Sequence, residues 1–255
     1  MSHIKLVLQY DGTNYAGWQI QANAATIQGH LEEVILKITG ERSRVTGAGR
    51  TDAGVHALEQ VAAFRTNSNL SPDIFMRALN ANLPPDIRVM NAVECPEGFH
   101  PRYDAKSKTY SYLISGMGAY SVFMQRYSWN MRCQLDRDAM KEAAHYLIGR
   151  HDFSSFRASG CSSTHPVREI SGIEISEMNT IGFMGFSLDV PLIKISITAT
   201  AFLRHMVRNI AGTLVDAGRE KCPPSRIKEI LEARDRRLAG KTAPSGGLFM
   251  EKIVY

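Results

Sequence analysis

Residues 46–56 have the sequence TGAGRTDAGVH, and the interpretation of the whole chain starts from this stretch. Five glycines and alanines lie on either side of an Arg-Thr-Asp sequence at residues 50–52. Because glycine has no Cβ and tolerates positive φ, such a loop lets a bulky ligand approach the backbone closely. Arg50 and Asp52 place a guanidinium and a carboxylate two positions apart. This combination favours a reaction that needs an ionised acid beside an anionic ligand.

Two familiar phosphate-binding motifs do not fit this loop. The dinucleotide fingerprint GxGxxG fails because its sixth position is Asp52 and because it requires a helix after the loop. Residues 55–64 alternate instead as a strand does. A Walker loop would end in Gly-Lys-Ser or Gly-Lys-Thr, and this loop contains neither. A glycine hairpin in which Asp52 only caps a turn remains as an alternative, although eleven consecutive residues of this kind disfavour it.

The length and charge of the chain limit the possible classes of protein. Its 255 residues suffice for one large domain or two ordinary ones. The hydrophobic content of 44% and the charged content of 22% are typical of a globular protein. The net charge of +5 suits a polyanionic partner and equally suits an ordinary basic surface.

The cysteines argue against a metal site. Cys95, Cys133, Cys161 and Cys222 are far apart and form no CxxC pair, so we predict no structural zinc. Cys161 and His165 are close in sequence, but two ligands do not make a tetrahedral site. Sparse cysteines and the absence of a signal peptide predict a cytoplasmic protein. No apolar run is long enough to cross a bilayer.

The first part of the chain predicts alternating strands and helices. Residues 3–10 alternate as a strand, and residues 27–39 form an amphipathic helix that Gly40 ends. The strand after the loop ends near residue 65. A helix begins at Ser71, which occupies the capping position, and ends before the prolines at 84 and 85.

The second part repeats this order. Pro96 and Gly98 indicate a boundary, so we predict domains at residues 1–98 and 99–255. Residues 108–115 predict a strand, and Asp136 caps a helix that ends before Gly149. Strands at 170–175 and 192–200 follow, and then helices at 203–215 and 225–234. Strand, helix, strand in each half predicts the α+β class with a weak structural repeat.

Seven segments resemble one known family, the tRNA pseudouridine synthases of the TruA family. The most specific is GRTDAGVHA at residues 49–57. The others occur in the family's order and span nearly the whole chain: YDGTNYAGWQ (10–19), TIQGHLE (26–32), NANLPPDI (80–87), KTYSYLI (108–114), DFSSFR (152–157) and FLRHMVRNIAG (202–212). Residues 116–126 match nothing that we can place.

The resemblance implies a fold and an activity. The fold is the pseudouridine synthase fold, with two α+β halves whose antiparallel sheets join around a central basic cleft. The activity is isomerisation of uridine to pseudouridine at positions 38, 39 and 40, in the anticodon arm of tRNA, by a homodimer. The N-glycosidic bond breaks, the uracil turns, and its C5 joins the ribose. Because nothing is oxidised and no group is imported, no cofactor is needed.

The resemblance also implies three catalytic residues. Asp52 is the nucleophile, and an aspartate is ionised at neutral pH. Whether it attacks the base or the sugar, or acts through a glycal, stays open. Tyr110 would stack under the base, whereas on the residues alone it is a core aromatic of a strand. Arg208 would pair with the catalytic carboxylate. Arg204 lies four positions earlier, on the same face of the predicted helix.

The remaining cations are candidates for binding RNA. A stacked uridine must flip out before it reacts, and Arg50 could fill the vacated space or hold a phosphate. We predict RNA contacts at Arg50, Lys106, Lys108 and Arg204, with Arg65, Arg102, Arg157 and Arg168 as further candidates. Tyr112 is predicted to be core, and no role is assigned to His56 or His205.

Two other functions remain to be separated from this hypothesis. A non-catalytic RNA-binding module of similar fold would use the basic surface and the tyrosine but would not need Asp52. A base deaminase is disfavoured because its zinc signature combines HxE with PCxxC, and no PCxxC segment occurs in the sequence.

Overall fold

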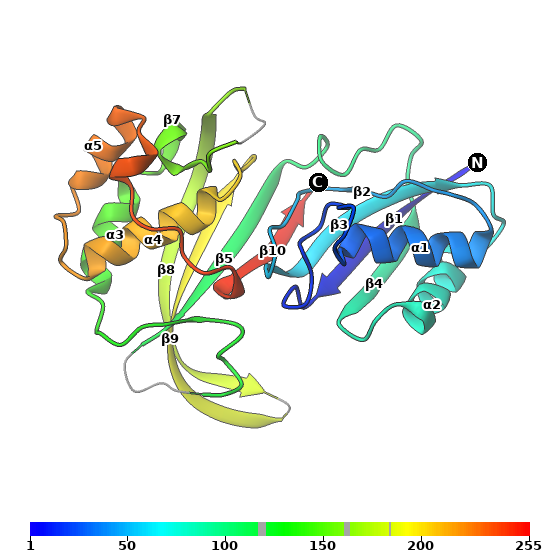
Figure 1. Cartoon of the computed structure of the whole chain (residues 1–255), viewed down its shortest axis with the longest axis horizontal. Coiled ribbons are helices and arrows are strands. Elements are labelled where there is room, and N and C mark those ends of the chain that lie inside the picture. The colour runs from blue at the N-terminus through cyan, green and yellow to red at the C-terminus, as the bar shows by residue number, and fades with distance from the viewer. Residues whose placement is uncertain (117–120, 161–163, 184) are drawn as a thin grey trace. The chain divides into compact units, whose positions relative to one another are not determined.

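The computed structural model describes residues 1–116, 121–160, 164–183 and 185–255. It divides into two compact units, Met1–Lys106 with Phe249–Tyr255, and Ser107–Leu248 (Figure 1). The first unit thus extends beyond residue 98, where the sequence predicts a domain boundary. Residues 99–106 belong to it because Lys106 N donates to Val254 O at 2.8 Å and the Tyr255 hydroxyl donates to Pro101 O at 2.8 Å.

The first unit is a sheet covered by two helices. Its strands are β1 (Ser2–Tyr10), β2 (Thr46–Gly47), β3 (His56–Thr66), β4 (Ile87–Glu94) and β10 (Leu248–Val254). The order is β4-β1-β3-β10, with β2 also paired to β3. β1 is antiparallel to β3 and β4, whereas β10 runs parallel to β3. Helices α1 (Ile27–Thr39) and α2 (Pro72–Asn82) pack against each other on this sheet (Figure 1).

Local sequence explains these elements. Ile4, Leu6 and Leu8 alternate along β1 and are completely buried, as the period of two requires. In α1 the apolar face is buried, and Gly40 ends the helix with φ of 74°, a conformation that glycine adopts without strain. The predicted strand and helix are therefore confirmed here.

The second unit has the same kind of architecture. Its strands are β5 (Ser107–Ser115), β6 (Trp129–Asn130), β7 (Gly149–Asp152), β8 (Val167–Phe183) and β9 (Phe186–Ala199), in the order β5-β9-β8-β7 with β6 beside β5. Helices α3 (Arg137–His145), α4 (Met206–Gly218) and α5 (Arg226–Ala233) gather together in this unit (Figure 1). The chain therefore has the predicted α+β class.

The β8–β9 hairpin is much longer than the two predicted strands. Its distal part is stabilised by a small apolar cluster around Val190, Leu192 and Met124, with Met178 and Leu188 packed against it. Met124 comes from the segment 116–126, to which the sequence assigned no role. Residues 117–120 of that segment, like Cys161, lie outside the described residues.

Helix α4 starts later than predicted. Its N-cap is His205, with φ of 61°, so the backbone turns out of the helical path just before Met206. Arg204 therefore lies before the helix, and the prediction that it shares a helix face with Arg208 is wrong.

The described helices contain no segment that is both long and apolar enough to span a bilayer.

Candidate active site

Asp52 lies in the connection between β2 and β3, in the first unit. Its side chain is half-buried, whereas the neighbouring Arg50 is exposed. Val55 N donates to Asp52 O at 3.1 Å, and Gly54 has φ of 76°. The glycine thus permits a tight turn that leads directly from Asp52 into β3.

The loop between β1 and α1 holds this turn backbone to backbone. Trp18 N donates to Thr51 O at 3.0 Å, and Gly54 N donates to Tyr15 O at 3.2 Å. Gly17 has φ of 98°, and a Cβ there would clash with Thr51 O and lie 2.9 Å from the carbonyl carbon of Asp52. The two sequence motifs at 10–19 and 49–57 are therefore parts of one structural feature, which allows no side chain at Gly17.

Two buried polar side chains, those of Tyr10 and Gln60, lie under the same loop. The Tyr10 hydroxyl is 2.9 Å from Thr51 Oγ1, and Gln60 Nε2 donates to Gly49 O at 2.8 Å. Burial raises the pKa of Tyr10 to about 12, so its hydroxyl stays protonated. Nothing in the sequence indicates these contacts, because Tyr10 and Gln60 fit the alternation of their strands.

His56 is part of the core of the first unit. It is 2% exposed, and its ring stacks on Phe249 with centroids 4.8 Å apart. Its Nδ1 lies 3.1 Å from Gly12 N and 3.0 Å from Asp11 Oδ1. These contacts join β3, β10 and the turn after β1, which is a structural role.

Tyr110 lies on β5 in the second unit and is 7% exposed. Its ring meets Phe202 edge to face at 5.0 Å. Tyr112, on the same strand, is completely buried, and its hydroxyl donates to Pro244 O at 2.8 Å. Burial raises the pKa of Tyr112 above its ordinary value, although the Arg208 charge opposes this. The prediction that Tyr112 belongs to the core is confirmed.

Arg208 occupies the first turn of α4, in the second unit, and is half-buried. Its Nε donates to Ala243 O at 2.8 Å, and Ala243 N donates back to Arg208 O at 3.1 Å. The segment that supplies Ala243 passes so close to α4 that a Cβ on Gly212 would lie 3.0 Å from the Lys241 carbonyl carbon. This close packing orients the guanidinium.

The other predicted RNA contacts differ in exposure. Lys106 and Arg204 are exposed, whereas Lys108 is 6% exposed. Among the residues that the structure describes, no group of three or more histidine, cysteine or acidic side chains could hold a metal.

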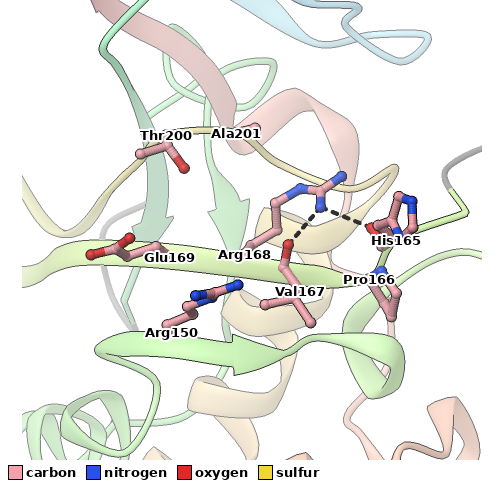
Figure 2. A pocket seen from close by; sticks show the side chains of 8 residues that line it. All are labelled: Arg150, His165, Pro166, Val167, Arg168, Glu169, Thr200 and Ala201. Carbon is pink, nitrogen blue, oxygen red and sulfur yellow. Dashed lines mark hydrogen bonds between the residues drawn. The ribbon is translucent and has the colours of Figure 1, made fainter.

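A separate hollow of about 460 Å³ lies at the start of β8 in the second unit. Figure 2 shows Arg168, one of the further RNA candidates, with its guanidinium turned toward two backbone carbonyls. Its Nη1 donates to His165 O at 2.8 Å and to Val167 O at 2.7 Å. Arg150 from β7 and Glu169 from β8 also line the hollow.

Comparisons with known proteins give a family. The family model described as tRNA pseudouridine synthase matches residues 6–104 and 143–255. A protein of Pelobacter propionicus described as tRNA pseudouridine synthase A is 44% identical over 255 residues, which cover all of both chains. One of Myxococcus xanthus with the same description is 43% identical and covers all of this chain and 92% of its own.

Among solved structures, the crystal structure of the archaeal box H/ACA sRNP Nop10-Cbf5 complex contains a similar chain. The identity is 13% and the TM-score is 0.35, with 84% of this chain and 42% of that chain covered.

Proposed function

Because the chain belongs to the tRNA pseudouridine synthase family, we propose that it isomerises uridines 38, 39 and 40 in the anticodon arm of tRNA. Membership of this family identifies the protein as an isomerase that acts on uridine in tRNA. The anticodon positions, the identity of the nucleophile and the flipping of the base are the proposed part.

The proposal depends chiefly on Asp52 in the motif at 49–57. Its half-buried side chain projects from a turn that backbone hydrogen bonds hold on both sides. A carboxylate held in this way is preorganised for attack on a nucleoside, because little freedom remains to be lost in the reaction. The reaction breaks the N1–C1′ bond and forms the C5–C1′ bond; the proton on C5 goes to water, and N1 takes up a proton in its place.

We assign the other two catalytic roles to Tyr110 and Arg208. Tyr110 stacks under the flipped uracil, where an aromatic contact is worth about 1–3 kcal/mol. Arg208 pairs with the Asp52 carboxylate and keeps it charged when water is excluded. We further propose that the enzyme acts as a homodimer in the cytoplasm, with both subunits holding one tRNA. These assignments are supported by the resemblance of residues 49–57, 108–114 and 202–212 to the family.

Release of label tests the reaction. We expect the protein alone to release tritium to water from tRNA that carries tritium at C5 of uridine, because C5 loses its hydrogen when it bonds to the ribose. Sequencing after pseudouridine-specific derivatisation then locates the product. Product outside positions 38–40 would overturn the proposed specificity. Binding of tRNA without any release would favour the non-catalytic RNA-binding module.

Arg50→Ala tests the proposed contact with the RNA backbone. Arg50 is exposed beside Asp52, so we expect slower turnover and a slope of log Kd against log salt that is smaller by about one. The control is Arg77→Ala, which removes an exposed arginine that is paired with Asp73 on α2. An unchanged slope in Arg50→Ala would show that this side chain does not contact a phosphate.

A further inference from the structure

Three polar side chains are buried beneath the turn that carries Asp52. Tyr10, Thr51 and Gln60 are 4%, 6% and 0% exposed. Burial of polar groups costs free energy unless hydrogen bonds compensate for it. Gln60 Oε1 has no hydrogen-bond partner within the part of the chain that the structure describes. The amide of Gln60 is therefore a poor choice for stability alone, and an apolar side chain would suit this core position better.

The polar contacts are directed at the two residues that flank Arg50. Gln60 Nε2 donates to Gly49 O at 2.8 Å, and the Tyr10 hydroxyl is 2.9 Å from Thr51 Oγ1. Gln60 Nε2 and the Tyr10 hydroxyl are 3.5 Å apart, so they interact only weakly. The turn is thus anchored from below at Gly49 and at Thr51, immediately before Asp52.

We infer that Gln60 and Tyr10 are positioning residues for Asp52 and Arg50, an inference that rests on the proposed function. Both side chains project from strands of the sheet, β3 and β1, which are more rigid than the loop they hold. They fix the backbone on both sides of Arg50 and so limit where the Asp52 carboxylate lies. A displacement of about 1 Å at a reacting group lowers the rate by about 100-fold.

Gln60→Glu tests this inference, because it keeps the shape of the side chain and replaces the donor Nε2 with an oxygen. Burial and the facing Gly49 carbonyl both favour the neutral carboxyl, so its pKa should lie above the ordinary value of about 4.3. Below that raised pKa the carboxyl O–H donates to Gly49 O and restores the contact. Above it the carboxylate repels the carbonyl oxygen and displaces the turn.

The expected result is a new pH dependence. The kcat of Gln60→Glu approaches that of the wild type at low pH and falls by about tenfold or more as the pH rises, while KM for tRNA changes little. The stability of the variant falls over the same range, because a raised folded-state pKa stabilises the protein only while the group is protonated. The kcat is therefore measured per folded molecule, from circular dichroism at each pH.

Asn80→Asp is the matched control. Asn80 lies on α2 and holds the backbone of Val89 on β4, with Nδ2 donating to Val89 O and Val89 N donating to Asn80 Oδ1, both at 2.8 Å. We expect this variant to lose stability and keep its kcat. A similarly unchanged kcat and pH profile in Gln60→Glu would overturn the inference.

Two further measurements complete the test. If Gln60→Glu does not fold, Tyr10→Phe tests the inference, because it removes only the oxygen that contacts Thr51. A wild-type kcat in Tyr10→Phe would overturn the inference. A lower kcat with an unchanged KM would support it. Wild-type protein that releases no label would instead overturn the proposed function itself, whatever the variants do.

Discussion

Asp52→Ala is expected to bind tRNA almost as the wild type does and to release no tritium from C5-labelled uridine. The substitution removes the proposed nucleophile and leaves the proposed RNA contacts in place. Loss of a nucleophile costs far more than loss of a binding contact, and we expect a fall in kcat of more than about 10³-fold. The measurement is single-turnover release of label with enzyme in excess, beside a filter-binding titration of the same tRNA.

Two controls make this result specific. Asp52→Asn keeps the size of the side chain and removes only its charge, so we expect it to be as inactive as Asp52→Ala. Asp73→Ala removes an exposed carboxylate of α2 that is paired with Arg77, and it should leave turnover unchanged. Turnover at the wild-type rate in Asp52→Ala would refute the catalytic assignment and would leave a different acid to be found.

Gly17→Ala is expected to cause the second large loss, in both stability and activity. Its φ of 98° is unfavourable for alanine, and its Cβ would clash with Thr51 O and crowd Asp52. The positive φ alone costs about 1–2 kcal/mol, and relief of the clash must move the catalytic turn. We therefore expect a lower melting temperature together with a fall in kcat of about 100-fold.

Gly40→Ala separates the cost of positive φ in alanine from the effect of the Cβ clash on the turn. Gly40 also has positive φ, 74°, but a Cβ there would meet nothing within 4 Å. Gly40→Ala should lose only the stability that the unfavourable φ costs an alanine, and it should keep its kcat. Equal kcat values for the two variants, measured per folded molecule, would contradict the view that Gly17 holds the turn of Asp52.

The sequence predicts those features of the fold that depend on neighbouring residues. β1 and α1 follow from alternation along the strand, an apolar helix face and a glycine at the helix end, all of which act over a few positions. β10 has no comparable signal, since it is defined by pairing with His56 and Ala57 of β3. The distal β8–β9 hairpin likewise depends on Met124, which lies far from it in sequence.

The same distinction applies to the candidate site. Asp52 could be proposed as the nucleophile because its motif is continuous, and Arg208 and Tyr110 could be proposed because their segments resemble those of the family. The contacts of Gln60 with Gly49 and of Tyr10 with Thr51 bring together residues 11 and 41 positions apart. A buried amide or phenol within a strand gives no sign in the sequence of which backbone atom it contacts. Arg204 was misplaced because nothing local indicates that His205 adopts positive φ.

The parallel pairing of β10 with β3 has a consequence for biosynthesis. Ribosomes make the first unit's helices and four of its strands long before Phe249, whose ring stacks on His56 just after the turn of Asp52. Domains that are contiguous in the chain fold as they emerge, but here the strand position beside His56 stays vacant until Phe249 and Met250 have been made. A nascent chain should therefore acquire its final protease resistance around this turn only after β10 has been made, later than the other elements of the first unit.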